Sequence, residues 1–287
     1  MTIIVLTSSI SLIIGLALGR KLAVRGITAE NGLQNRQETA YIVLAIIVLP
    51  LLLFLLIGRL NLSHLIPQIF VLYLGEHLQN LMLGGGWFVL GLLIGMGWPG
   101  RRDRRRLRQL LVAIAAIAVS LAILLHYSLP VTGLLGEPLI VENIVLQTTP
   151  YTCAPASIAT LARLIGTAPN LSEREAVILT GTDRFGTSTL AEISALKRLG
   201  LAPRYRRGLT VAELAAAKQP ALLHVKEPVG GTKIGHTVVL LETNSQKQTF
   251  VIGNPLYGRL ERTFDSMEGY WTGEAVFASG GDRSNLK

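Results

Sequence analysis

The single cysteine of this 287-residue chain, Cys153, lies in the stretch QTTPYTCAPASIATLARLIG, residues 147–166. Apolar residues recur there at helical spacing, Pro155 suits a first helical turn, and Gly166 is a typical helix end. We therefore predict a helix over 153–165 with the thiol at its N-terminus. The positive end of the helix dipole stabilises a thiolate, which is the nucleophilic form of cysteine. The alternative reading is a buried, unreactive thiol.

A cysteine nucleophile needs a base to take its proton and a third group to orient that base. His236 follows the segment GTKIG and opens the predicted strand 236–243, whereas His224 lies inside an apolar strand, where a packed histidine is expected. Asn254 follows the predicted strand 249–253. If these two strands pair through the turn TNSQKQ, His236 and Asn254 lie at the same end of a hairpin. The Asn254 carbonyl oxygen could then orient the imidazole, although an asparagine before proline is also a common turn residue.

Acyl transfer also needs a donor for the oxyanion that forms in the transition state. Gln147 lies six residues before the cysteine, and its side-chain amide is the candidate, the alternative being a polar linker residue. The histidines are scattered without the spacing of metal ligands, so we predict no metal site and no cofactor. One cysteine also excludes an intramolecular disulfide.

The region around these residues reads as a helical part followed by strands. Three S/T-x-x-E spacings predict helix starts: Ser172–Glu175, Thr189–Glu192 and Thr210–Glu213, for helices near 172–180, 188–199 and 210–217. Runs rich in valine, leucine and phenylalanine predict strands at 221–226, 236–243, 249–253 and 275–278. Helices followed by an antiparallel sheet predict an α+β domain.

The N-terminal part is too apolar for an ordinary soluble domain, since the whole chain has a mean hydropathy of +0.47 and 16% charged residues. Apolar runs long enough for a hydrocarbon core predict four transmembrane helices: 3–19, 41–58, 69–98 and 109–128. The 69–98 region contains GGG and several polar residues; one interrupted crossing is expected there rather than two.

The charges predict how this part is oriented. The 20–40 loop and the run RRDRRRLR near 101–108 are basic and are therefore expected on the cytoplasmic side. With four crossings, everything after the last one is extracytoplasmic. The basic run is read as a topology determinant beside the lipid bilayer, and no nucleic-acid partner is predicted. The expected domains are a membrane region 1–128, a linker 129–142, a catalytic domain 143–280 and a tail 281–287.

The order of these segments resembles a known family. Glutamine, then CAPAS opening a helix, then GHTVVL, NPLYG and YWTGEAVF are similar to the papain-like cysteine peptidases that process double-glycine leader peptides of bacteriocins. The resemblance covers about 140–278 and implies a papain-like α+β fold with an antiparallel sheet. It makes Cys153 the nucleophile, His236 the base, Asn254 the third triad residue and Gln147 the oxyanion donor. The family usually has aspartate where Asn254 stands.

The predicted function is a membrane-anchored cysteine peptidase that hydrolyses peptide bonds through a Cys–His–Asn triad, with double-glycine leader peptides or other peptides as substrates. The first alternative is a catalytically weak or inactive peptide-binding module that assists an export or assembly partner. Acyl transfer to an acceptor other than water and a membrane scaffold are further alternatives. The sequence has no GxxxxGK[ST] motif, so it predicts no ATP-driven exporter within this chain.

Overall fold

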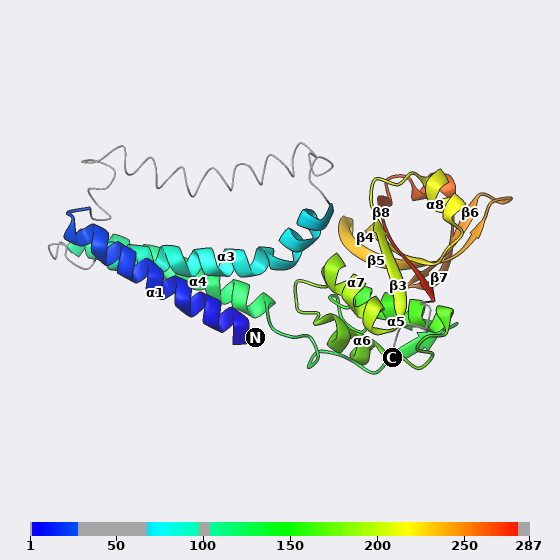
Figure 1. The fold of residues 1–287 in the computed structure, drawn as a ribbon, viewed down its shortest axis with the longest axis horizontal. Coiled ribbons are helices and arrows are strands. Elements are labelled where there is room, and N and C mark those ends of the chain that lie inside the picture. The colour runs from blue at the N-terminus through cyan, green and yellow to red at the C-terminus, as the bar shows by residue number, and fades with distance from the viewer. Residues whose placement is uncertain (1, 28–67, 98–103, 281–287) are drawn as a thin grey trace. The chain divides into compact units, whose positions relative to one another are not determined.

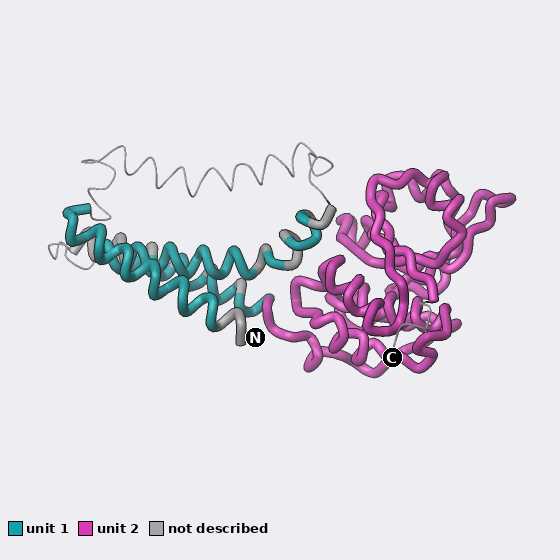
Figure 2. The backbone as a smooth tube through the Cα atoms, in the orientation of Figure 1, with its two compact units in different colours: residues 1–127 teal, residues 128–287 magenta. Residues whose placement is uncertain are grey.

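A computed structural model describes residues 2–27, 68–97 and 104–280 of the chain. The chain divides into two compact units, Met1–Tyr127 (unit 1) and Ser128–Lys287 (unit 2), which are coloured separately in Figure 2. The predicted span 41–58 and the predicted tail lie outside the described residues.

Unit 1 consists, in its described part, of long helices: α1 (Thr2–Val24), α3 (Gln68–Gly97) and α4 (Arg104–Tyr127) (Figure 1). The α3 helix continues through the GGG segment, so the interruption expected there is absent, and the single crossing remains a prediction. Within the described residues, two segments are long and apolar enough to cross a membrane, Leu6–Val24 and Asn80–Gly97. The apolar part of α4, Ile117–Tyr127, is shorter. Four crossings therefore remain a prediction.

Helices α1 and α3 pack through glycines. Two glycines spaced four residues apart on each helix form the interface: Gly15 and Gly19 on α1, Gly91 and Gly95 on α3. A Cβ atom at any of these positions would overlap a backbone carbonyl oxygen of the other helix. Such small-xxx-small pairs let two backbones approach closely. Since Gly15 lies against Phe88 and Gly19 against Gly95, the two helices run parallel.

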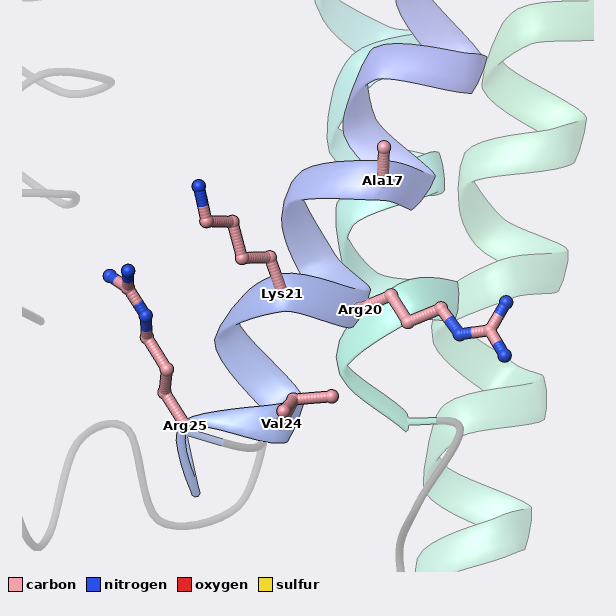
Figure 3. A pocket seen from close by; sticks show the side chains of 5 residues that line it. All are labelled: Ala17, Arg20, Lys21, Val24 and Arg25. Atoms are coloured by element: carbon pink, nitrogen blue, oxygen red, sulfur yellow. The ribbon is translucent and has the colours of Figure 1, made fainter.

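Helix α4 packs on α3 in the opposite direction through a cluster that includes Leu83, Leu90 and Leu121 (Figure 1). At the C-terminal end of α1 the apolar surface gives way to basic side chains. Figure 3 shows Lys21 and Arg25 projecting from one side of this helix end and Arg20 from another. Basic residues directly after an apolar helix are typical of the cytoplasmic end of a span.

Unit 2 is built on a curled six-stranded antiparallel sheet in the order β3-β8-β4-β5-β6-β7 (Figure 1). Its strands are β3 (Leu201–Arg206), β4 (Ala221–Val229), β5 (Thr232–Asn244), β6 (Thr249–Asn254), β7 (Gly258–Thr263) and β8 (Trp271–Gly280). A two-residue turn at Glu142 and Asn143, both with positive φ, joins the small hairpin of β1 (Leu139–Val141) and β2 (Ile144–Leu146). Hairpins with such turns favour asparagine because it tolerates positive φ.

The helices of unit 2 follow the local signals closely. They are α5 (Cys153–Ile165), α6 (Glu173–Thr180), α7 (Thr189–Arg198), α8 (Val211–Ala217) and the short α9 (Phe264–Met267). Ser172 and Thr210 form complete capping boxes, as predicted. The capping box predicted for Thr189 is wrong, because Ser188 is the N-cap of α7 and Glu192 turns into the protein. Strands β3 and β7 were not predicted.

The sheet separates two hydrophobic clusters. Helices α5 and α7 cover one face, where Ile158, Leu161 and Leu196 pack against Leu222 and Val276. The other face is lined by a second cluster: Leu214, Leu223, Val238, Phe250, Ile252 and Met267. Alternate residues of one strand serve the two clusters, as the two-residue period of a strand requires. The β5–β6 hairpin anticipated from TNSQKQ is present, although β5 begins at Thr232 and not at His236.

Candidate active site

Cys153 is the first residue of α5. Backbone N–H groups at this end of the helix face the thiol. The N-cap residue, Thr152, makes no side-chain cap, because its hydroxyl instead bonds with Thr149. The N–H groups of Cys153 and Ala154 therefore face the sulfur, and the backbone of Thr237 makes a further hydrogen bond to it. Thr237 directly follows His236, so the thiol contacts the residue of β5 that comes next after His236.

His236 and Asn254 meet at the open end of the β5–β6 hairpin. His236 Nε2 lies 3.0 Å from Asn254 Oδ1, and both residues are buried. The register explains this contact, since Val239 pairs with Gly253 and the strands bring the residues at the ends of this ladder together. The hairpin argument from the sequence thus gives the observed neighbours.

The protonation of His236 follows from the way Asn254 is held. Asn254 Oδ1 also accepts a hydrogen bond from the Leu256 N–H at 2.9 Å, and its Nδ2 donates to Glu227 Oε2 at 2.9 Å. These two bonds fix which end of the amide carries oxygen. His236 must then donate from Nε2, which leaves Nδ1 as the nitrogen with a free lone pair. This is the tautomer that a general base acting through Nδ1 needs.

Burial opposes charge on both candidate catalytic groups. Desolvation raises the pKa of the Cys153 thiol, and the nearby Glu192 adds to this, while the backbone N–H groups act in the other direction. Desolvation also lowers the pKa of His236, opposed by the Asn254 hydrogen bond and the charge of Glu227. Burial therefore favours the neutral form of each group, a thiol at Cys153 and an unprotonated imidazole at His236.

Gln147 belongs to the same corner of the domain. Its backbone N–H donates to the Pro255 carbonyl oxygen at 2.9 Å, which ties the approach to α5 to the residue after Asn254. Its Nε2 donates to the Thr149 carbonyl oxygen at 2.7 Å, and its Oε1 is buried with no hydrogen-bond partner among the described residues. An amide nitrogen carries two hydrogens, and the bond to Thr149 uses one of them.

A second cluster lies on the face of the sheet that α5 and α7 cover. His224 has one carboxylate at each ring nitrogen: Glu192 at 2.9 Å from Nε2 and Glu274 at 3.0 Å from Nδ1. Both nitrogens can donate only in the protonated ring, and these carboxylates raise the pKa of His224 to about 10 against the effect of burial. Glu192 also accepts a hydrogen bond from the Thr237 hydroxyl. His224 is thus a structural imidazolium and not the simple packed histidine expected from its apolar strand.

Sequence reasoning missed two buried acids beside the candidate site, Glu192 and Glu227. Glu192 was assigned to a helix cap. Glu227 had a visible signal, because it continues the alternation of Leu223 and Val225 on the face that points into the core. A carboxylate in register with core residues indicates a buried acid with dedicated partners.

Comparison with known proteins gives an independent view of this unit. Residues 141–282 match the Peptidase C39 family. An uncharacterized protein of Methanothermobacter marburgensis is 30% identical over 135 residues, which is 47% of this chain and 87% of that protein. An uncharacterized protein of Methanothermobacter thermautotrophicus is 29% identical over the same length, with the same coverage.

Solved structures of two transporter-linked peptidases are also similar to unit 2. One is a double glycine motif protease from an AMS/PCAT transporter, in complex with the leader peptide; it is 18% identical, with a TM-score of 0.41, covering 50% of this chain and 94% of that one. The other is the peptidase domain of Streptococcus ComA, 25% identical, with a TM-score of 0.40, covering 47% of this chain and 95% of that one.

Proposed function

The chain belongs to the peptidase C39 family and is a cysteine peptidase with the papain-like fold and antiparallel sheet of that family; from this premise we propose that Cys153, His236 and Asn254 form its catalytic triad. The observation that carries the proposal is the bond from buried His236 Nε2 to Asn254 Oδ1 at 3.0 Å, with the thiol of α5 beside the next residue of β5. Gln147 is proposed as the oxyanion donor.

In the proposed reaction, the Cys153 thiol gives its proton to His236 Nδ1 as the sulfur attacks the carbonyl carbon of the scissile peptide bond. The N–H of Cys153, with the free hydrogen of Gln147 Nε2, stabilises the negative oxygen. When the C–N bond breaks, Nδ1 returns the proton to the leaving amine, and a thioester remains. Water then gives a proton to Nδ1 and attacks the thioester, which releases the carboxylic acid and restores the thiol.

The substrate is proposed to be a peptide with a double-glycine motif before the scissile bond. The family membership supports this class, and the leader peptide bound to the similar transporter-linked protease is of this kind. An export or membrane-assembly partner would supply such a peptide.

The membrane anchor is the second part of the proposal. Helices α1 and α3 are parallel and α4 is antiparallel to them, which suits alternating crossings with one further span between α1 and α3. The basic end of α1 and the arginines that open α4 then lie on the cytoplasmic side. Unit 2 follows α4 and would be extracytoplasmic. A reporter fused at residue 287 tests the side, and a cytoplasmic signal would contradict it.

The cleavage test uses the full-length chain in detergent with a synthetic peptide that carries Gly-Gly, and the same peptide with Ala-Ala as its matched control. Cysteine-dependent cleavage after Gly-Gly is expected in the wild type and none in Cys153→Ala with an unchanged circular dichroism spectrum. Cleavage that persists in Cys153→Ala would disprove the assignment. Binding of the Gly-Gly peptide by wild type and Cys153→Ala alike, without cleavage by either, would instead support the peptide-binding module.

A further inference from the structure

Glu227 is a buried carboxylate that the proposed triad does not use. It lies on β4, is 2% exposed, and points toward the same face of the sheet as Leu223 and Val225. Moving a carboxylate from water into a protein interior costs several kcal/mol unless hydrogen bonds and charges compensate it. Its position therefore has to be explained by its partners.

Two donors converge on one oxygen of this carboxylate. Asn254 Nδ2 donates to Glu227 Oε2 at 2.9 Å, and the Tyr270 hydroxyl donates to the same oxygen at 2.6 Å. The Arg262 guanidinium lies 3.7 Å from the centre of the Tyr270 ring and brings a positive charge to this cluster. Such surroundings suit an anion.

The hydrogen bonds form one chain from the imidazole inward. His236 on β5 donates to Asn254 on β6, Asn254 donates to Glu227 on β4, and each of the three side chains is buried. Asn254 can present its oxygen to His236 only while its nitrogen faces an acceptor, and Glu227 is that acceptor. This series of hydrogen bonds also places the negative charge of Glu227 next to Asn254, whose side chain is uncharged.

We propose that Glu227 is a positioning residue of the active site, which fixes the orientation of Asn254 and supplies the negative charge that stabilises protonated His236. This inference rests on the proposed function of Cys153, His236 and Asn254. In this role Glu227 acts through its hydrogen bond to Asn254 and through its electric field.

The other charged groups near the pair do not replace this role. Glu192 of α7 acts on the Cys153 thiol of α5, but His224 on β4 holds it in an ion pair on the opposite face of the sheet. Arg262 of β7 lies against the Tyr270 ring, and its charge is not among the groups that shift the pKa of His236. Since the charge of Glu227 raises the pKa of His236, its removal should make proton transfer from the thiol less favourable.

The test exchanges the positions of amide and carboxylate. Three full-length variants are compared with the wild type: Glu227→Gln, Asn254→Asp and the double variant Glu227→Gln/Asn254→Asp. The rate of alkylation of Cys153 by iodoacetamide is measured from pH 5 to 9, and the label reports one site because the chain has one cysteine. Cleavage of the Gly-Gly peptide is the second readout, and Glu242→Gln, an exposed carboxylate of the same sheet, is the matched control.

Glu227→Gln is expected to lower the alkylation rate at pH 7 about tenfold, which is one pKa unit of lost stabilisation of the imidazolium. Labelling should then rise only at higher pH, where the thiol ionises without help from the imidazole, and the acid limb of kcat/KM should move to lower pH. Asn254→Asp alone should also lose activity, because it sets two carboxylates against each other. The double variant should recover to within about threefold of the wild type, since one carboxylate and one amide are present again.

Two results would overturn the inference. One is a Glu227→Gln variant with the pH profile of the wild type; the other is an Asn254→Asp variant as reactive as the wild type while Glu227 is present, which decides the matter even if Glu227→Gln does not fold. A wild-type thiol that labels no faster than that of His236→Ala would overturn the proposed function and this inference with it. Fast wild-type labelling that Glu227→Gln leaves unchanged would overturn the inference alone.

Discussion

Helices α1 and α3 of unit 1 meet backbone to backbone, whereas α5 of unit 2 meets its sheet through large apolar side chains. At the first interface glycines bring carbonyl oxygens of one helix against the other, and leucine, isoleucine and phenylalanine side chains of both helices remain exposed. At the second, residues such as Ile158, Leu161 and Val239 are fully buried. Unit 2 gains much of its stability by removing apolar side chains from water, whereas many apolar side chains of α1 and α3 stay exposed.

The two units therefore differ in what a substitution disturbs. At the four interface glycines of α1 and α3 an added methyl group has no space, so the close contact of these helices depends on the absence of side chains there. In unit 2 the same sheet holds apolar clusters and two buried polar networks, and specificity comes from paired hydrogen bonds. We expect substitutions in one unit to leave the structure of the other unit unchanged, and the following experiments test this independence.

The largest effect is expected from His236→Ala. Without the base, cleavage of the Gly-Gly peptide should fall by about 10³-fold or more. The helices of unit 1 should be unaffected, which can be measured by adding His236→Ala to the Cys153→Ala protein that carries the cross-link described next. His126→Ala, at the end of α4, is the control for loss of an imidazole elsewhere. Retained cleavage in His236→Ala would contradict the proposed base.

The helix interface is tested by a disulfide between cysteines introduced at Ser11 and Gly84 in a Cys153→Ala background, since the Ser11 hydroxyl oxygen lies 3.4 Å from the site of a Gly84 Cβ. Gly91→Leu should prevent this cross-link in bicelles because its side chain would collide with α1. Overpacking of this kind costs about 1–3 kcal/mol or more.

Gly85→Leu is the matched control, since a Cβ there meets no atom of the described residues within 4 Å. Equal cross-linking in the Gly91 and Gly85 variants would show that the glycine contact does not hold the helices together. Gly91→Leu in the chain that keeps Cys153 should leave peptide cleavage within about twofold of the wild type, because Gly91 and the proposed triad belong to separate compact units.

The imidazolium of unit 2 predicts a dependence of stability on alkaline pH. The pKa of His224 is raised to about 10, so its stabilisation is complete below about pH 6.5 and is lost as pH rises toward 10. Between pH 7 and 8.5 the free energy of unfolding should fall by up to about 1.4 kcal/mol per pH unit, measured by urea denaturation. His236 does not contribute in this window, because its lowered pKa places its titration below it.

In His224→Gln the same slope should largely disappear, and the domain should be less stable at pH 7 because Glu192 loses its counter-charge. A slope equal to that of the wild type would mean that other groups cause the pH dependence.

The smallest effect concerns a helix end. Ser188 accepts a hydrogen bond from the Ala191 N–H as the N-cap of α7. Ser188→Ala should therefore lower the free energy of unfolding by about 1 kcal/mol, whereas Thr189→Ala should change it less. Thermal unfolding of both variants measures this. A larger loss for Thr189→Ala would restore the cap originally expected from the sequence.

Much of the candidate site could be predicted from the sequence because it depends on interactions between residues close together in the chain. Pro155 in a first turn and Gly166 at a helix end define α5 and place Cys153 at its N-terminus. The turn signal of TNSQKQ defines the β5–β6 hairpin, and a hairpin brings its two ends together whatever surrounds it. For the same reason the capping boxes at Ser172 and Thr210 were predictable, since each is closed within four residues.

Tertiary structure alone decided the rest. The partners of Glu227, Glu192 and His224 come from strands and helices far apart in the chain, and no local pattern shows which elements will meet. Strands β3 and β7 are short, half-exposed edge strands, so they lack the apolar runs that reveal buried ones. The pairs Gly15–Gly19 and Gly91–Gly95 can be found in the sequence, but only the packing of α1 on α3 showed that they face each other. Local spacing determined where each functional residue stands on its element, and long-range packing decided which charges surround it.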